Sequence, residues 1–226
     1  MKTFIPFVLV VCIYLPVSAN KGLAGKSLTF PTKTKTSSVK LYPIRCPDLL
    51  AFTLCMTAAS EETRSYGLFS YATSHNANEL MIWKGKNGEF SLYLSRTIVS
   101  FSLPEMNGLL RHICVTWESR LGLVTFWVNG ERSVRKVSNK SRVVRGHGTF
   151  ILGQEQDSVG GSFDIDQSFV GEITNVNLWD HVLTASEIKV VSESCHGLGG
   201  NIINWESIQY GKIGEVKIED NQDCTV

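Results

Sequence analysis

The chain has 226 residues, 43% of them hydrophobic, and a formal net charge of +1 at pH 7. This near-neutral balance gives no electrostatic footprint for nucleic acid, and no segment is long and apolar enough to span a bilayer. One local run of basic residues could attract an anionic partner, although such runs more often form a solvated strand face. The run consists of Arg132, Arg135, Lys136, Lys140, Arg142 and Arg145.

The first 19 residues have the pattern of a secretory signal peptide. Lys2 gives a positive start, residues 4–17 are apolar, and Val17-Ser18-Ala19 is a small-residue cleavage site. We therefore expect a secreted protein whose mature form is one domain over residues 20–226, long enough to bury a substantial core. Removal of Lys2 brings its formal net charge to 0.

Most of the mature chain has the pattern of short strands separated by turns. Asn87-Gly88 and Asn129-Gly130 are strong hairpin signals, because both turn positions tolerate a positive φ. Many short strands at regular spacing predict an all-β sandwich of two sheets. The expected strands include residues 52–56, 80–83, 90–94, 124–128, 133–137, 150–152, 169–173 and 176–179.

An acidic, amide-rich loop, residues 153–167, lies between two of these strands. Calcium takes roughly 6–8 oxygen ligands from carboxylates, carbonyls and water. A bound divalent ion would also offset the repulsion between closely spaced carboxylates. A solvated polar turn would have a similar composition, so the loop alone leaves both interpretations open.

One helix is expected after the strands. Thr184 and Glu187 form a capping box, in which the Thr184 hydroxyl accepts from the Glu187 amide and the Glu187 side chain reaches back. Ile188 and Val191 lie three residues apart and would share the buried face. Three glycines are expected to end the helix and redirect the chain, namely Gly197, Gly199 and Gly200.

Five cysteines remain once Cys12 has left with the signal, namely Cys46, Cys55, Cys114, Cys195 and Cys224. Secretion favours disulfides, and an odd number leaves one thiol free or bridged to another chain. Asn139-Lys140-Ser141 is an N-glycosylation sequon in a polar, turn-like stretch. Asn139 is therefore a candidate glycosylation site.

Residues 112–119, His-Ile-Cys-Val-Thr-Trp-Glu-Ser, fit the pentraxin signature His-x-Cys-x-Ser/Thr-Trp-x-Ser/Thr. Residues 69–73, 153–161 and 175–180 are also similar to stretches of that family, in the same order and at the same spacing. The mature chain thus resembles a short pentraxin of the C-reactive protein and serum amyloid P type. The resemblance implies an antiparallel, lectin-like jelly-roll sandwich with one short helix and no enzymatic activity.

The resemblance also implies two disulfides. It pairs Cys55 with Cys114 across two core strands, and Cys195 with Cys224 near the C-terminus. Cys46 has no counterpart in the family, and its thiol could join subunits or be buried. Because Cys114 would be consumed in a disulfide and no nucleophile with an acidic orienter is apparent nearby, His112 is expected to be a packed, hydrogen-bonded residue rather than a catalytic one.

Family members hold two adjacent calcium ions on one face of the sandwich, and the ions themselves bind the ligand. The residues implied for this chain are Glu155 and Asp157 bridging both ions, Gln156 through its backbone carbonyl, Asp164 and Gln167 at the outer ion, and Asn78 at the inner ion. Ala77 stands where the family commonly has Asp, which predicts a weaker inner site. Asp164 replaces the usual Glu, and Asp166 is an extra carboxylate that could compensate or face solvent.

Phosphocholine binding in the family uses the two calcium ions, an apolar side chain and a carboxylate. Trp83 falls at or beside the apolar position and could offer a cation–π face, or it could be a core residue. Ile98 stands at the carboxylate position and cannot attract a quaternary ammonium. We therefore expect a wider class of ligand that includes phosphate, phosphoethanolamine and acidic sugars.

The resemblance further implies a cyclic pentamer with all calcium sites on one side, formed by a heterologous interface. Avidity on a repetitive microbial or damaged-cell surface could then exceed single-site affinity by about 10²–10⁴. Such a protein would serve innate immunity, in some members as an acute-phase protein that recruits complement or Fc receptors. Asn129 replaces an Asp implicated in complement binding, which argues against that role here.

Two other functions were weighed. A laminarinase-type glycoside hydrolase of similar fold would carry Glu-x-Asp-x-x-Glu on one strand, because retaining hydrolysis needs two carboxylates about 5–5.5 Å apart. Residues 163–167 are the nearest fragment and contain no Glu. A laminin-G-like adhesion domain is also a calcium-binding sandwich, but the signature at residues 112–119 disfavours it.

Overall fold

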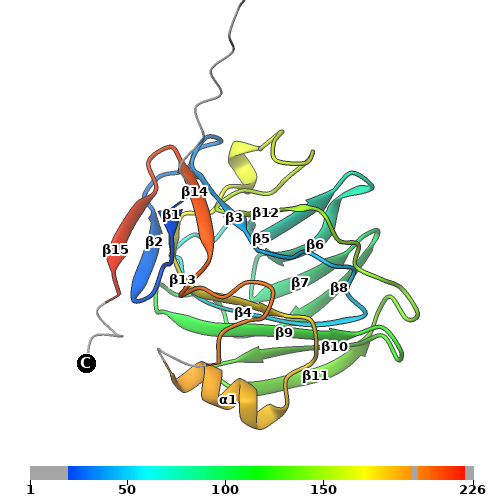
Figure 1. Ribbon diagram of the computed structural model, residues 1–226. Helices are drawn as coiled ribbons and strands as arrows, with labels where there is room; N and C mark the ends of the chain where they lie inside the picture. Colours follow the sequence, from blue (N-terminus) through cyan, green and yellow to red (C-terminus); the bar gives the residue numbers. More distant parts are fainter. Residues whose placement is uncertain (1–19, 195–197, 222–226) are drawn as a thin grey trace, which may run out of the picture.

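The computed structural model describes residues 20–194 and 198–221. The expected signal peptide, Gly197 and the predicted Cys195–Cys224 disulfide lie outside these residues. Two antiparallel sheets face each other across one hydrophobic core, with a short helix on the outside (Figure 1). This is the sandwich that the sequence predicts, and within the described residues no helix is long and apolar enough to cross a membrane.

The first sheet has eight strands in the order β1-β14-β3-β12-β5-β6-β7-β8. Their bounds are β1 Asn20–Lys21, β14 Gln209–Ile213, β3 Ser38–Tyr42, β12 Thr149–Leu152, β5 Tyr66–Thr73, β6 Asn76–Lys84, β7 Glu89–Leu94 and β8 Thr97–Ser102.

The second sheet has seven strands in the order β11-β10-β9-β4-β13-β2-β15. Their bounds are β11 Glu131–Val137, β10 Leu123–Val128, β9 Arg111–Glu118, β4 Ala51–Ala59, β13 Gly171–Trp179, β2 Lys26–Phe30 and β15 Lys217–Asp220. The one α-helix of the described chain is α1, Ala185–Glu193, and a single 3-10 turn, η1, covers Ile165–Gln167.

Both Asn-Gly hairpins form as expected. Asn87 and Gly88 have φ values of 54° and 73°, and they join β6 to β7. Asn129 and Gly130, with φ values of 49° and 81°, join β10 to β11. These left-handed conformations match the right-handed twist of the flanking strands, which is why this dipeptide predicts hairpins.

The strands after the acidic loop differ from the sequence prediction. Residues 169–173 and 176–179 were expected as separate strands, but one strand, β13, runs from Gly171 to Trp179. Its pairing with β4 shifts between Thr174 and Asn177, where Asn175 has a φ of 53°. A β-bulge therefore produces the break that the hydrophobic pattern shows.

The signature strand β9 alternates as expected. One row of its side chains joins the core between the sheets and consists of Ile113, Val115 and Trp117. On the opposite face, Cys114 joins a second buried cluster beneath α1, whose other members include Cys55, Trp127, Trp179 and Ile188. The helix thus covers the outer face of the seven-stranded sheet and seals the disulfide from solvent.

The helix begins as predicted and ends earlier than predicted. The capping box is complete, because the Thr184 hydroxyl accepts from the Glu187 amide and the Glu187 carboxylate accepts from the Thr184 amide. Ile188 is buried, and Val191 packs against the same cluster. The last helical residue is Glu193, and Ser194 has an extended backbone, so the helix stops before the glycines that were expected to end it.

Candidate metal centre

The acidic loop connects β12 to β13 and packs beside the β5–β6 hairpin. Figure 1 shows it in yellow near the top of the molecule. The Gln156 side chain fixes it, because its Nε2 donates to the Thr149 and Ser70 carbonyls at 3.0 and 3.1 Å, and its Oε1 accepts from the Gly160 amide at 2.8 Å. Gln154 Nε2 donates to the Ser37 carbonyl at 2.8 Å. These buried amides anchor the start of the loop to the sheet, whereas residues 157–160 and 164–166 are exposed.

Glu155 lies at the centre of the site and is only 3% exposed. Gly67 on β5 permits this burial, since a Cβ at position 67 would lie 3.3 Å from the Glu155 Cβ. Burial, together with the nearby Asp157 and Asp164 carboxylates, raises the pKa of Glu155 to about 7, although a hydrogen bond from the Asn78 side chain lowers it. The cluster is therefore short of positive charge.

Four side-chain oxygens of the loop and of the start of β6 are buried without a hydrogen-bond partner among the described residues, and apart from Gln154 Oε1, which no prediction assigned to calcium, three belong to predicted ligands. These three are Asn78 Oδ1, Glu155 Oε2 and Gln167 Oε1. Buried polar atoms in folded proteins are normally paired, because an unpaired one costs about 1–3 kcal/mol. All three belong to the residues that the sequence predicts as calcium ligands, and carboxylate and carboxamide oxygens are the ligands that calcium takes.

The remaining carboxylates of the loop lie at its surface. Asp157 and Asp164 are exposed, and Asp164 Oδ1 accepts from the Asp166 amide at 2.9 Å, which caps η1. Asp166 forms an ion pair with Lys33, and the hydrogen bond from Lys33 is the main reason why the pKa of Asp166 is lowered. Asp166 thus faces solvent, which is one of its two predicted roles, and there it is also paired with a cation from a distant part of the chain.

The start of β6 supplies the other side of the site. The Asn78 amide donates to Asn76 Oδ1 at 2.8 Å, which orders the strand entry. Ala77 is half-buried between these two amides and offers no side-chain oxygen. The predicted weakness of the inner site therefore stays a prediction with a clear structural origin.

Three side chains that point away from the core between the sheets lie on the strands β6 to β8 of the eight-stranded sheet. Trp83 is half-buried and is not part of the core between the sheets, so the core interpretation of this residue is wrong. Ile98 is 55% exposed and pairs with Tyr93 across β7 and β8. Burial, Glu89 and Glu155 raise the pKa of Tyr93, which places its phenol near Glu155. Sequence reasoning missed Tyr93, although alternation along residues 90–94 places it opposite the buried Phe90, Leu92 and Leu94.

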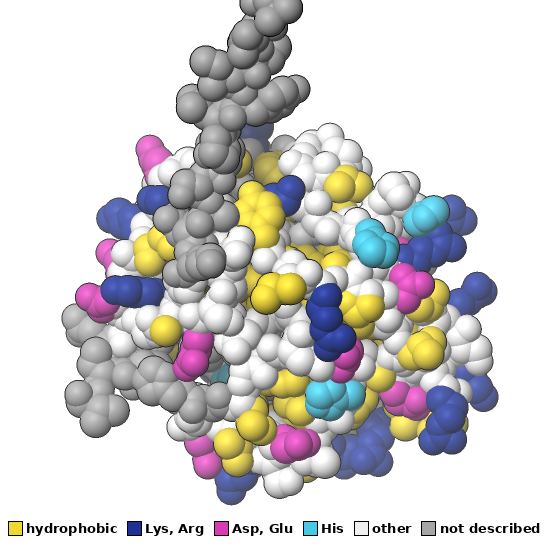
Figure 2. All heavy atoms as spheres, viewed as in Figure 1, with side chains coloured by type: hydrophobic (Ala, Val, Ile, Leu, Met, Phe, Trp, Pro, Cys, Tyr) yellow, Lys and Arg dark blue, Asp and Glu magenta, His cyan; other side chains and the backbone are white. Residues whose placement is uncertain are grey.

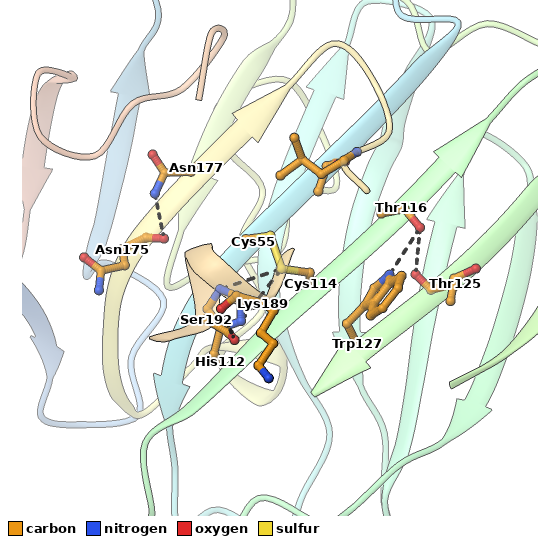
Figure 3. The surroundings of a disulfide bond; sticks show 12 residues. Cys55, His112, Cys114, Thr116, Thr125, Trp127, Asn175, Asn177, Lys189 and Ser192 are labelled. Carbon is orange, nitrogen blue, oxygen red and sulfur yellow. Dashed lines mark hydrogen bonds between the residues drawn. A yellow bond between two sulfur atoms is a disulfide. The ribbon is translucent and has the colours of Figure 1, made fainter. Parts of the chain in front are cut away.

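A second group of ligand-type atoms surrounds the disulfide (Figure 3). Cys55 and Cys114 are bonded as predicted, and the ring nitrogens of His112 lie 3.7 and 3.8 Å from Cys114 Sγ. Because both sulfurs are consumed, only the imidazole could bind a metal. Burial lowers the pKa of His112 to about 4, so the ring is neutral at physiological pH. His112 is a packed core residue, as expected.

Two further candidates are placed by their hydrogen bonds. Cys46 is a half-buried free thiol, and its Sγ lies 3.1 Å from the Tyr71 hydroxyl.

The Asn139 carboxamide holds the β7–β8 hairpin, since its Nδ2 donates to the Leu94 carbonyl at 2.6 Å and its Oδ1 accepts from Thr97 at 2.8 Å. Its use as a glycosylation acceptor stays a prediction.

The chain was compared with known families, proteins and structures. The Pentaxin family profile matches residues 26–220. Over 203 residues the chain is 44% identical to C-reactive protein of Danio rerio, which covers 88% of this chain and 90% of that protein. Over 210 residues it is 40% identical to serum amyloid P-component of Cavia porcellus, covering 93% and 94%. The heptameric SAP-like pentraxin from Limulus polyphemus superposes with a TM-score of 0.80 at 23% identity, covering 90% and 99%.

Proposed function

The chain belongs to the pentraxin family, and on that premise we propose that it is a secreted, calcium-dependent pattern-recognition protein of innate immunity. Members of this family are recognition proteins rather than enzymes, so neither a glycoside hydrolase nor a laminin-G-like domain is needed to explain the sandwich. The ligands that we propose are phosphorylated or acidic groups on microbial or damaged-cell surfaces.

The three unpartnered oxygens of Asn78, Glu155 and Gln167 carry this proposal. A hard cation would satisfy all three and would also stabilise the Glu155 carboxylate, whose pKa is raised to about 7 by burial first and by the Asp157 and Asp164 carboxylates second. Asp157 and Asp164 are the exposed carboxylates that could complete the set. The residues present therefore fit calcium, which when bound would offer open coordination positions to anionic oxygens of a ligand.

We propose two calcium ions per subunit, with the inner one held more weakly. Asn78 is the inner-site residue, and Ala77 beside it lacks the carboxylate that the family commonly places there. Asp164 keeps the charge of the usual Glu on a shorter side chain. Asp166 contributes less than its charge suggests, because Lys33 already compensates it.

The surroundings favour a broad anionic specificity. Ile98 is exposed at the position where a carboxylate would be needed to bind choline. Because its side chain is uncharged, it cannot select a quaternary ammonium group. Trp83 and Tyr93 offer half-buried aromatic surface on the same face of the sheet. Phosphoethanolamine and acidic sugars fit this environment at least as well as phosphocholine does.

We propose that the subunits form a closed ring, with five members expected from the family resemblance. The Limulus polyphemus relative is described as heptameric, so ring size varies within this fold. A ring would multiply weak single sites by avidity. Asn129 is occupied in its hairpin turn, where its Oδ1 accepts from the His112 amide at 2.9 Å, and we propose no complement-binding role for it.

Calcium titration and bead retention test the proposal. Glu155→Gln and Asp157→Asn should each lower calcium affinity by at least about 100-fold, since loss of a partner outside the ligand set already costs 10–100-fold. Both variants should lose calcium-dependent retention on phosphoethanolamine beads while keeping the oligomer seen by light scattering. Glu131→Gln, an exposed position on β11, is the matched control. Retention of the wild type in EDTA would contradict the proposal.

A further inference from the structure

A cavity of about 450 Å³ opens beside the metal centre and belongs to no function assigned above. It lies where the β5–β6 turn, the β7–β8 turn and the connection from β11 to β12 meet. We name it the arginine cavity. Its lining consists of His75, Asn76, Glu79, Ser95, Arg96, Thr97, Asn139, Arg142, Val143 and Arg145.

The lining is strongly cationic. Arg96, Arg142 and Arg145 are exposed, and within the described chain none of the three is part of an ion pair, in contrast to Arg45 and Arg64. Figure 2 shows dark-blue side chains gathered along the right side of the molecule, where Figure 1 places these turns. Three uncompensated guanidinium groups around one hollow make a site for anions, because each can bind a sulfate or carboxylate through two hydrogen bonds.

The lining contains one carboxylate, which offsets only part of the charge of the three guanidinium groups. Glu79 is 2% exposed, and its Oε1 accepts from the Arg145 backbone amide at 2.7 Å. This hydrogen bond holds the backbone of the loop that carries Arg145, while the Arg145 side chain is exposed. An incoming anion would meet the guanidinium groups at the rim rather than this buried group.

Neutral polar groups fill the space between the charges. Asn76, Ser95 and Thr97 contribute amide and hydroxyl groups that can exchange hydrogen bonds with sugar hydroxyls. No Phe, Tyr or Trp side chain lines the arginine cavity, and its one aromatic ring is the His75 imidazole, whereas proteins that hold single-stranded nucleic acid stack successive bases on several aromatic side chains. The lining therefore favours an acidic glycan over a nucleic acid.

The arginine cavity is continuous with the metal centre. A neighbouring open hollow of about 420 Å³ shares His75, Asn76, Ser95 and Arg96 with it. That hollow is also lined by Asn78, whose Oδ1 is one of the three unpartnered oxygens, and by Tyr93. A single groove thus leads from the predicted calcium ligands to Arg145.

We propose that the arginine cavity is a second anion subsite, which binds an acidic group of a sulfated or carboxylated polysaccharide whose neighbouring acidic group is held at the metal centre. This inference rests on the proposed calcium-dependent function and names its ligand class. A ligand with one phosphate occupies only the metal centre, whereas a polysaccharide with repeated acidic groups occupies the whole groove. Repeated anionic sugars are therefore preferred over single anions.

The predicted glycan at Asn139 would compete with this ligand, because Asn139 lines the arginine cavity. The experiment therefore uses a Ser141→Ala background, which removes the sequon and keeps the Asn139 carboxamide with its bonds to Leu94 and Thr97. The test variant adds Arg96→Gln, Arg142→Gln and Arg145→Gln. The matched control adds three charge losses at exposed lysines outside the cavity, Lys35→Gln, Lys86→Gln and Lys217→Gln.

Binding is measured in calcium buffer with two probes, dextran sulfate and phosphoethanolamine. We expect the arginine variant to lose at least ~10-fold in affinity for dextran sulfate, as removal of charge-assisted hydrogen bonds implies, with a far smaller loss for phosphoethanolamine. The lysine control should keep the affinity for dextran sulfate. Replacing the same arginines by lysine should give an intermediate loss, since the charge remains without the planar fork.

An equal loss in the lysine control, or no loss in the arginine variant, would overturn the subsite. Equal affinity of the parent protein for dextran sulfate and for inorganic polyphosphate would overturn the assignment to glycans. A third outcome is that EDTA leaves dextran sulfate binding intact but the arginine variant loses that binding. The arginine cavity would then be an anion site, and the claim that calcium holds a second acidic group of the same polysaccharide would be wrong. Phosphoethanolamine binding is measured in the same EDTA buffer as a separate test of the proposed function, which predicts that this binding is lost.

Discussion

Two regions of the molecule carry side chains of the metal-ligand type, the disulfide and the acidic loop, and they differ in how completely their polar atoms are satisfied. Among the His, Cys, Asp and Glu side chains of the described residues, only the group at the disulfide brings three ligand atoms this close together. Cys55, His112 and Cys114 lie within 4.8 Å of one another in a sealed, apolar cluster, and their sulfurs are bonded to each other. At the acidic loop, Glu155 is also buried, but its Oε2 has no hydrogen-bond partner among the described residues, and the Asp157 and Asp164 carboxylates lie nearby together with the Asn78 side chain. The polar atoms of the first group are satisfied, and those of the second leave buried oxygens unpaired among the described residues.

This difference shows that proximity of ligand-type residues does not identify a metal site. The disulfide cluster gains its stability from covalent closure and packing beneath α1. The loop cluster is held in place by amide hydrogen bonds while its oxygens stay unpaired, which is the arrangement expected of a site built for a ligand.

The largest effect is expected from the disulfide. Replacing Cys55 and Cys114 by Ala should lower the free energy of unfolding by about 4 kcal/mol, the chain-entropy value for a loop of this length. Chemical denaturation of the variant beside wild type measures it, with Cys46→Ser as the control for loss of a free thiol. Calcium affinity of the folded variant should stay at the wild-type value, and a large change would show that the two clusters are coupled.

His112 should make the protein acid-sensitive. Its pKa is about 4 in the fold against 6.5 for the unperturbed group, so the unfolded chain binds a proton that the folded chain excludes. Stability should therefore be complete above about pH 6.5 and should fall as the pH drops toward 4, by an amount on the order of 3 kcal/mol. Denaturation midpoints at several pH values test this. The slope should shrink in His112→Gln and persist in His147→Asn, an exposed control.

Glu155 should give the opposite slope when calcium is absent. Because its pKa is raised to about 7, the folded chain binds a proton that the unfolded chain releases above pH 4.5. In EDTA, stability should decrease as the pH rises from about 4.5 to 7, by an amount on the order of 2 kcal/mol, and calcium should restore it above pH 7. Thermal unfolding with and without calcium measures the difference. If the dependence of stability on pH in EDTA is unchanged in Glu155→Gln, another titratable group causes it.

The smallest effect concerns the inner calcium site. Ala77→Asp adds a carboxylate beside Asn78 and should raise calcium affinity by about 10-fold, within the range that ligand charge tunes. Calorimetric titration of the variant beside wild type measures the gain. Ala77→Asn, which adds an oxygen without the charge, is the matched control and should give less. Unchanged affinity in both would show that Ala77 does not weaken the site.

Local patterns in the sequence determined most of the fold. The Asn-Gly turns, the alternation of residues 112–117 and the capping box at Thr184 depend only on near neighbours, because φ preferences, strand periodicity and hydrogen-bond reach act over a few residues. The family signature then implied the Cys55–Cys114 disulfide and the ligand residues. Three of those residues carry the unpartnered oxygens, although their role in calcium binding stays a prediction.

Tertiary structure decided what depends on residues far apart in the chain. Lys33 lies 133 positions from the Asp166 that it neutralises, and no local pattern predicts that pairing. Gly67 on β5 allows Glu155 to be buried, and two separate connections bring Arg96 on the one side and Arg142 and Arg145 on the other around one cavity. The net charge around a site and the exposure of its side chains depend on every segment that packs there. Both are therefore fixed only when the strands of the two sheets have paired.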